Sequence, residues 1–246
     1  MMIDRRAALA AFAALPVATA ARAAPSVTAT TLYNRAVIVE GQGSPGGYDP
    51  AAPDATELTP RNLADARASG VTLISQTVGA VGNIPDAFEQ SVAGFAQAID
   101  GFARYPDLFM PVLTRADIAR AKASKRIGII MGFQDSTAFG TDLDRVDLFH
   151  SLGLRICQPT YNRRNLIGDG CLEPGNAGLS KLGVELVARL NAKQILVDAS
   201  HAGPRTQAET IAACKGRSIS RCELHSGNDA TRRERIGNLR TAVPYG

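Results

Sequence analysis

A short apolar run at residues 196–200 constrains the fold more than any other part of the chain, because it ends on His201 directly before a Gly-Pro turn. An apolar run of this length that follows an amphipathic helix is typical of a buried parallel strand. The carboxyl ends of such strands carry the functional groups of α/β folds. We therefore expect His201 at a functional edge of a sheet, in the place of a metal ligand.

A helix is predicted directly before this strand. Ser180 is a favoured N-cap residue, and the apolar residues after it recur at helical spacing. These residues are Leu182, Leu186, Val187 and Leu190. Helix, strand, histidine and turn therefore form one α/β unit.

The rest of the chain alternates between predicted strands and helices. Apolar runs predict strands at residues 36–40, 71–78, 126–131 and 154–159, with a further strand from residue 218. Helical spacing and capping residues predict helices at residues 86–102, 114–123, 142–152 and 204–214. The first of these helices carries an apolar stripe that we interpret as core packing: Phe88, Val92, Phe95, Ile99 and Phe102. Repeated β-α units favour a parallel sheet that closes, or nearly closes, into a barrel.

The second half of the chain also carries a recognisable set of residues. The set comprises Gly178-Leu179-Ser180, Gly183, Leu186-Val187, Leu190-Asn191 and the run that ends on His201. It resembles the signature of the membrane dipeptidase (renal dipeptidase) family, and the likeness extends over residues 37–220. The family comprises zinc peptidases on a (β/α)8 TIM-like barrel of the metal-dependent amidohydrolase type. The resemblance therefore implies that fold, zinc as cofactor, and a short peptide or dipeptide as substrate.

The resemblance also assigns the first metal position of the family to this chain. The histidine and aspartate that follow the first strand in the family are replaced here by Gln42 and Ser44. The bridging glutamate after the middle strand is replaced by Gln134, and the adjacent Asp135 would point the other way in an extended segment. A neutral amide is a poor zinc ligand, so we expect this position to bind metal very weakly or to be empty.

The second metal position retains one family ligand, His201. Arg221 stands where the family has another histidine, and His225 is the nearest substitute. Beyond Ser220 the residues no longer resemble the family, so we expect a frameshift or truncation and a barrel without its last strands. Such a barrel would expose unpaired strand edges, which favour pairing with a partner. A homodimer is therefore an open alternative.

The loop at residues 168–176 follows a predicted strand on the active face of a barrel. Asp169 and Glu173 are candidates to contact the amino group of a substrate, although turn chemistry also explains such residues. Arg163 or Arg164 is a candidate to bind a carboxylate through two hydrogen bonds. Asp198 either orients a neighbouring group or makes a buried hydrogen bond.

The N-terminus is typical of an export signal. Arg5-Arg6 precedes a mild apolar run at residues 7–21, and Ala21-Arg22-Ala23 offers the small residues of a cleavage site. We interpret residues 1–23 as a twin-arginine signal, with an ordinary secretory signal as the alternative. Residues 24–220 then form the dipeptidase-like barrel and residues 221–246 a divergent basic tail. No later segment offers the roughly 20 apolar residues that span a bilayer, so we expect a periplasmic protein without membrane insertion.

Composition and motifs exclude several other classes. A chain of 246 residues with 45% hydrophobic content can build a large core, and its net charge of +4 is small. The arginines at 232, 233 and 235 indicate a solvated tail better than a nucleic-acid site. Phosphate-loop, nucleophile-elbow and dinucleotide motifs are absent. Three hypotheses remain: a periplasmic zinc dipeptidase, a catalytically silent barrel that binds a small peptide or amino-acid derivative, and a fragment without function.

Overall fold

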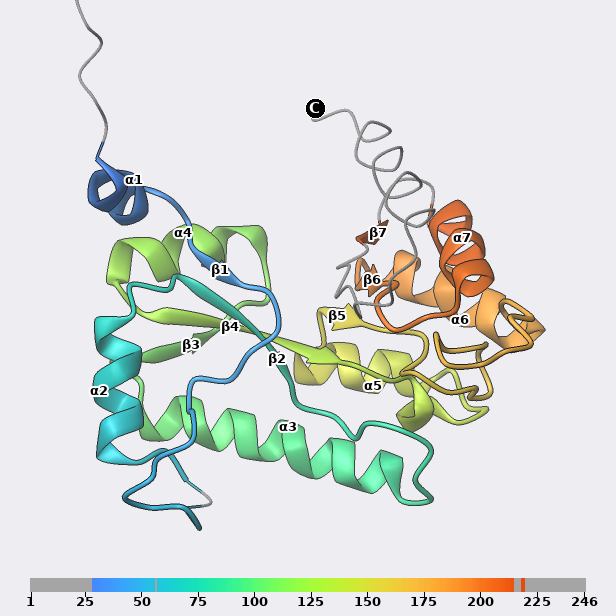
Figure 1. Cartoon of the computed structure of the whole chain (residues 1–246), viewed down its shortest axis with the longest axis horizontal. Helices are drawn as coiled ribbons and strands as arrows, with labels where there is room; N and C mark the ends of the chain where they lie inside the picture. The colour runs from blue at the N-terminus through green and yellow to red at the C-terminus, as the bar shows by residue number, and fades with distance from the viewer. Residues whose placement is uncertain (1–27, 56, 215–217, 220–246) are drawn as a thin grey trace, which may run out of the picture. The chain divides into compact units, whose positions relative to one another are not determined.

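The computed structural model describes residues 28–55, 57–214 and 218–219 (Figure 1). The chain divides into two units, residues 1–36 and residues 37–246. In the first unit the described residues form helix α1 (Ala29–Arg35), whose N-terminus is capped by the hydroxyl of Thr28. The proposed signal at residues 1–23, the tail, Arg221 and His225 lie outside the described residues.

The second unit alternates strands and helices, as the sequence predicts, and adds elements that the sequence analysis did not predict. Its helices are α2 (Pro60–Ala68), α3 (Ala87–Arg104), α4 (Arg115–Ser124), α5 (Arg145–Leu152), α6 (Lys181–Ala192) and α7 (Pro204–Ala213), with a 3-10 turn, η1 (Thr137–Phe139). Its strands are β1 (Val39–Glu40), β2 (Leu73–Thr77), β3 (Phe109–Pro111), β4 (Ile127–Phe133), β5 (Ile156–Cys157), β6 (Leu196–Asp198) and β7 (Ser218–Ile219). Among the described residues, no helix is long and apolar enough to span a bilayer.

The described strands form one parallel sheet in the order β1-β2-β4-β5-β6-β7, and β3 pairs with β4 beside this path. One edge of β4 bonds to β2, since the Gly128 amide donates to the carbonyl of Thr72 at 2.8 Å. The other edge is shared, because Ile127 donates to Leu108 before β3, and Arg155 before β5 donates to Met131. The result is a parallel half-barrel, which confirms the predicted α/β class and an incompletely closed TIM-like sheet.

The main core lies between the sheet and helices such as α3, α5 and α6, while α4 packs on the opposite face of the sheet (Figure 1). Phe95 of α3, Phe133 of β4 and Phe149 of α5 are fully buried, and the Phe133 and Phe149 rings meet edge to face at 4.8 Å. The prediction that the whole apolar stripe of α3 packs in the core is wrong in part, because Val92 and Ile99 are exposed.

The buried face of α3 is rotated away from the predicted stripe toward smaller residues. Ser91 is fully buried because its hydroxyl donates to the carbonyl of Ala87 at 2.6 Å and accepts the amide of Ala80 at 3.0 Å. Gly94 lies against β2, where an added Cβ atom would come within 1.8 Å of the Val78 carbonyl oxygen. A polar residue and a glycine thus allow the helix to approach the strand closely.

Helix α2 and strand β3 are among the elements without a counterpart in the sequence analysis. Helix α2 begins at Pro60 and is capped by Thr59, whose hydroxyl accepts the amide of Asn62 at 3.2 Å. Strand β3 has only three residues and forms because β4 is long enough to pair with it and with β5 along one edge. An apolar segment this short gives no clear periodicity.

Candidate functional site

The carboxyl ends of the parallel strands share one edge of the sheet, and polar side chains follow several of them. Gln42 and Ser44 follow β1, Gln134 follows β4, and His201 follows β6. The strands β1, β4 and β6 are not neighbours, because β2 and β5 lie between them. The edge therefore carries the predicted positions on three separated strands, each gap being about two strand spacings of ~4.8 Å.

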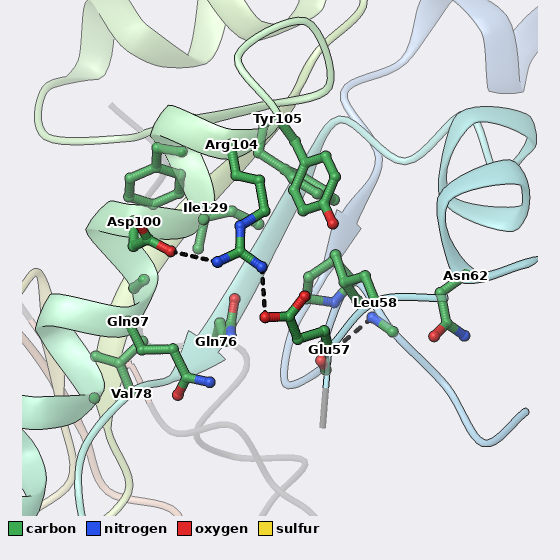
Figure 2. Close-up of a pocket in the computed structure, with 18 of the residues that line it drawn as sticks. Glu57, Leu58, Asn62, Gln76, Val78, Gln97, Asp100, Arg104, Tyr105 and Ile129 are labelled. Carbon is green, nitrogen blue, oxygen red and sulfur yellow. Dashed lines mark hydrogen bonds and ion pairs between the residues drawn. The ribbon is translucent and has the colours of Figure 1, made fainter. Parts of the chain in front are cut away.

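Gln42 and Ser44 have different surroundings although they are two residues apart. The Gln42 side-chain amide donates to the Thr77 hydroxyl at 2.8 Å, which ties the loop after β1 to the end of β2. Ser44 lines a cavity of about 490 Å³ bounded by α3, β2 and the loop before α2 (Figure 2). Arg104 spans part of this cavity and contacts Glu57 at 2.6 Å and Asp100 at 3.0 Å.

The end of β4 presents a half-buried Gln134 beside a buried Asp135. The Asp135 carboxylate accepts the Thr137 amide at 2.7 Å and the side-chain amide of Asn165 at 3.1 Å. It also accepts the Thr137 hydroxyl. Asp135 thus connects the end of β4 to η1 and to the loop after β5. Its carboxylate therefore stabilises the arrangement of these segments.

A buried polar network joins the ends of β5 and β6. Asp198 is fully buried; one of its oxygens accepts the Ser200 amide at 3.0 Å and the Ser200 hydroxyl at 2.7 Å. Its other oxygen accepts the Gln158 side-chain amide at 3.2 Å. Within the described residues, the Oε1 atom of Gln158 and the hydroxyl of Thr160 are buried without a hydrogen-bond partner. Burial, together with the charges of Asp135 and Asp198, raises the pKa of the Cys157 thiol well above its ordinary value.

His201 lies directly after β6 in the left-handed backbone region, with φ +59°. Its Nδ1 atom lies 2.9 Å from Oδ1 of Asn162, and its ring packs against Tyr161 with centroids 4.4 Å apart. The carbonyl of His201 accepts the amide of Cys171 at 2.8 Å. The histidine that the sequence places at a strand end is therefore enclosed by the loop after β5, and Asn162 is a neighbour that the sequence analysis did not single out.

The candidate substrate-binding residues of that loop contact one another. Arg164 binds both oxygens of Asp169, at 2.5 and 3.0 Å, and Asp169 also accepts the amide of Ala177 at 2.6 Å. The hydrogen bond from Arg164 lowers the pKa of the buried Asp169. Glu173 accepts the backbone amide of Arg164 at 2.9 Å, whereas Arg163 is exposed. The loop's own contacts thus involve Asp169 and Arg164, whereas Arg163 is exposed to solvent.

The described residues do not match the ligand set of a zinc pair. Such a site needs several histidine and carboxylate ligands around shared positions. Within residues 28–55, 57–214 and 218–219, no group of three or more His, Cys, Asp or Glu side chains is arranged to hold a metal ion. Gln42 is hydrogen-bonded to Thr77, and Asp135 accepts hydrogen bonds from Thr137 and Asn165.

Comparisons with known proteins by sequence and by structure both indicate peptidases and related hydrolases. Residues 57–218 match the model of the membrane dipeptidase family, peptidase family M19. A solved amidohydrolase from Pseudomonas aeruginosa is 30% identical, with a TM-score of 0.64 over 76% of this chain and 52% of that one. A metallopeptidase from Rhodobacter sphaeroides, solved with a phosphinate mimic of the dipeptide L-Ala-D-Ala, is 19% identical, with a TM-score of 0.62 over 75% of this chain and 64% of that one.

Curated relatives match a shorter stretch. The dipeptidase aclJ of Aspergillus oryzae is 29% identical over 107 residues, which is 42% of this chain and 25% of that protein. The chain therefore spans about half the length of the first of these solved structures and a quarter of this curated relative.

Proposed function

Because this chain belongs to the membrane dipeptidase family, we propose that it binds short peptides at the carboxyl edge of its half-barrel. Family membership supports a peptide-hydrolysing function and implies a metal. Amides follow the strands at Gln42, Gln134 and Gln158, however, and the carboxylates of Asp135 and Asp198 at the same edge are buried and hydrogen-bonded to neighbouring residues. Amides and imidazole pair with the N–H and C=O groups of a peptide, and neutral amides are poor ligands for zinc.

The observation that carries this proposal is the hydrogen bond from the Gln42 side-chain amide to Thr77, because the resemblance assigns Gln42 to the position of a family ligand. No three-ligand cluster occurs in the part of the chain that the structure describes. Peptide binding without metal-dependent hydrolysis by these residues is therefore the function that the geometry supports best. The dipeptide mimic bound by the Rhodobacter protein supports a dipeptide-sized ligand.

Zinc-dependent dipeptide hydrolysis is the second candidate, and the retained His201 favours it. The resemblance assigns His201 to the position of a family zinc ligand, and His201 follows strand β6. Since the described residues do not complete a zinc site, we assign no hydrolytic step to them.

One set of measurements on the purified chain separates the two candidates. Zinc content is measured by plasma mass spectrometry, affinity for L-Ala-D-Ala by calorimetry, and cleavage by detection of free alanine. Saturable binding without stoichiometric zinc or cleavage supports the first candidate, and two zinc ions with cleavage support the second. A folded chain that neither binds nor cleaves the dipeptide contradicts both.

A variant pair locates the binding site. His201→Ala should weaken dipeptide binding by about tenfold, the equivalent of one lost hydrogen bond. His150→Ala is the matched control, because His150 lies on α5 and should leave the affinity unchanged. Equal effects of the two substitutions would contradict a site at the carboxyl edge.

The proposal places the protein in the periplasm, exported by residues 1–23. Support comes from the paired arginines and the small residues at 21 and 23. Changing Arg5 and Arg6 to lysine should retain the uncleaved precursor in the cytoplasm of a bacterial host, as measured by fractionation. A cleaved product in the periplasm of that variant would indicate the ordinary secretory route.

A further inference from the structure

A second candidate binding site is the cavity of about 490 Å³ between α3, β2 and the loop before α2 (Figure 2). Its volume falls within the range of about 300–1,000 Å³ that is typical of small-molecule pockets. Ser44 lines this cavity, whereas Gln134 and His201 are not among its lining residues. The cavity is therefore distinct from the strand end that carries His201, and an inference about it goes beyond the proposed function.

The cavity exists because α3 presents small residues to it. Gly94, Ala98 and Gly101 recur at helical spacing along the face of α3 that lines the cavity. An added Cβ atom on Gly101 would have no other atom within 4 Å, so the space beside it is open. Buried apolar side chains also line the cavity, and they offer a surface for the apolar part of a ligand: Val78, Phe109 and Ile129.

Two side-chain amides in the cavity are available to a ligand. Gln76 of β2 and Gln97 of α3 line the cavity, and Figure 2 shows them around the same space as the Glu57 carboxylate. Among the described residues, neither amide has a hydrogen-bond partner. By contrast, both ends of the Asn62 amide are hydrogen-bonded within the protein. A primary amide offers both a donor and an acceptor, so it pairs well with an amide group of a ligand.

The ionised residues of the cavity leave an excess of negative charge. Arg104 contacts Glu57 at 2.6 Å and Asp100 at 3.0 Å. Among the described lining residues, two carboxylates thus accompany one guanidinium, which gives a net formal charge of −1. Because the guanidinium is already paired, an anionic ligand would have to displace a carboxylate from it. A cationic ligand is attracted to the same cluster without such a loss.

These properties together define one class of ligand. We propose that the cavity binds a small organic cation that carries an amide group and a short apolar side chain. The ammonium group lies near Glu57 and Asp100. The amide group pairs with Gln76 and Gln97, and the apolar side chain packs on the buried apolar residues. L-Leucinamide is a simple probe with all three features, and most of its α-amino group is protonated at pH 6.5.

Binding is measured by NMR titration of the 15N-labelled full chain with L-leucinamide at pH 6.5. The side-chain amide signals of Gln97 are assigned by their loss in Gln97→Leu, and the backbone signals of α3 give the affinity. We expect saturable shifts with a Kd on the order of 1 mM, as for a ligand of this size. Neutral N-acetyl-L-leucinamide should bind roughly threefold more weakly and anionic N-acetyl-L-leucine about tenfold more weakly, because they lose the attraction to the negative cluster.

Two variants test the residues of the cavity. Gln97→Leu removes one amide at nearly constant side-chain size, and it should weaken binding of L-leucinamide about fivefold, the equivalent of one hydrogen bond. Gln90→Leu is the matched control, because Gln90 lies on the same helix, binds Asp86 and does not line the cavity. Its affinity should stay unchanged. Gly101→Leu places a side chain in the open space and should abolish binding.

Three results would overturn the proposal: no saturable shifts in the natural chain, an anion that binds as tightly as the cation, and equal losses of affinity in Gln97→Leu and Gln90→Leu. The first two results need no variant that folds. The proposed function is decided separately, since His201→Ala should bind L-leucinamide like the natural chain and Gln97→Leu should bind L-Ala-D-Ala like the natural chain.

Discussion

Gln158 donates a 3.2 Å hydrogen bond from its side-chain amide to Asp198, a carboxylate with no exposed surface. The contact joins the ends of β5 and β6, two strands that pair over only two residues each. Ser200 supplies two further donors to the same carboxylate. A buried charge is tolerated only with such partners, so this network accounts for an acidic residue at the end of an apolar strand.

Removing the carboxylate should destabilise the fold. Asp198→Ala leaves the Gln158 amide and the Ser200 hydroxyl without their acceptor, which costs about 1–3 kcal/mol for each unsatisfied buried group. Urea unfolding followed by circular dichroism measures the loss. The control is Asp65→Ala on exposed α2, where a change within about 0.5 kcal/mol is expected. Equal stabilities of the two variants would show that the network contributes nothing to folding.

The pair formed by Arg164 and Asp169 should make stability depend on pH. The hydrogen bond from Arg164 lowers the pKa of Asp169 in the folded chain. As the pH falls, the unfolded state therefore takes up this proton at a higher pH than the folded state does. The stabilisation is fully present above the unfolded pKa of about 3.9 and is lost as pH falls through the lower folded value. In Asp169→Asn the unfolding free energy should be lower at pH 6, and its difference from the natural chain should shrink below pH 4.

Asp142→Asn is the comparison for this titration, since Asp142 is largely exposed and lies 3.7 Å from Arg145. Its unfolding free energy should follow that of the natural chain across the acid range. If the gap between Asp169→Asn and the natural chain stayed constant down to pH 2, the lowered pKa of Asp169 would not be the cause.

The sequence predicts the α6–β6 unit well because three local signals agree there. Ser180 caps α6 through a 3.0 Å hydrogen bond from Gly183, and Leu186, Val187 and Leu190 are fully buried. The apolar run becomes β6 as expected. The prediction fails where the signals are not local. Strand β3 forms only because the first residues of β4 offer it a pairing edge. The buried face of α3 depends on the close approach of Gly94 to Val78.

The site shows the same division between local and non-local information. Gln42, Gln134 and His201 follow strands, as their positions in the pattern predict. The partnership of Asn162 with His201 joins residues 39 positions apart through a loop, and no periodic signal marks it. The bidentate pair of Arg164 and Asp169 is likewise a property of the folded loop, which turns two candidate ligand-binding groups toward each other.

Gly170 should be intolerant of even one methyl group. A Cβ atom at this position would come within 2.2 Å of backbone atoms of Asn162, so Gly170→Ala forces the loop away from its place. Overpacking of this kind costs about 1–3 kcal/mol. Displacement of the segment 170–172, whose Cys171 amide donates to the His201 carbonyl, should also weaken binding of L-Ala-D-Ala. Thermal unfolding and calorimetry measure the two effects. An unchanged melting temperature together with an unchanged affinity would show that the loop adapts without cost.

Gly101 gives the opposite prediction for the same substitution. It lies within α3, where an added Cβ atom would have nothing within 4 Å. Glycine inside a helix is destabilising by about 0.5–1 kcal/mol relative to alanine, because it has more backbone freedom to lose on folding. Gly101→Ala should therefore raise the unfolding free energy by about that amount in urea. Because Gly101 lines the cavity beside α3 and His201 is not among the residues that line it, dipeptide affinity should stay unchanged. A loss of stability would mean that the space beside α3 is filled in solution by atoms that the methyl group displaces.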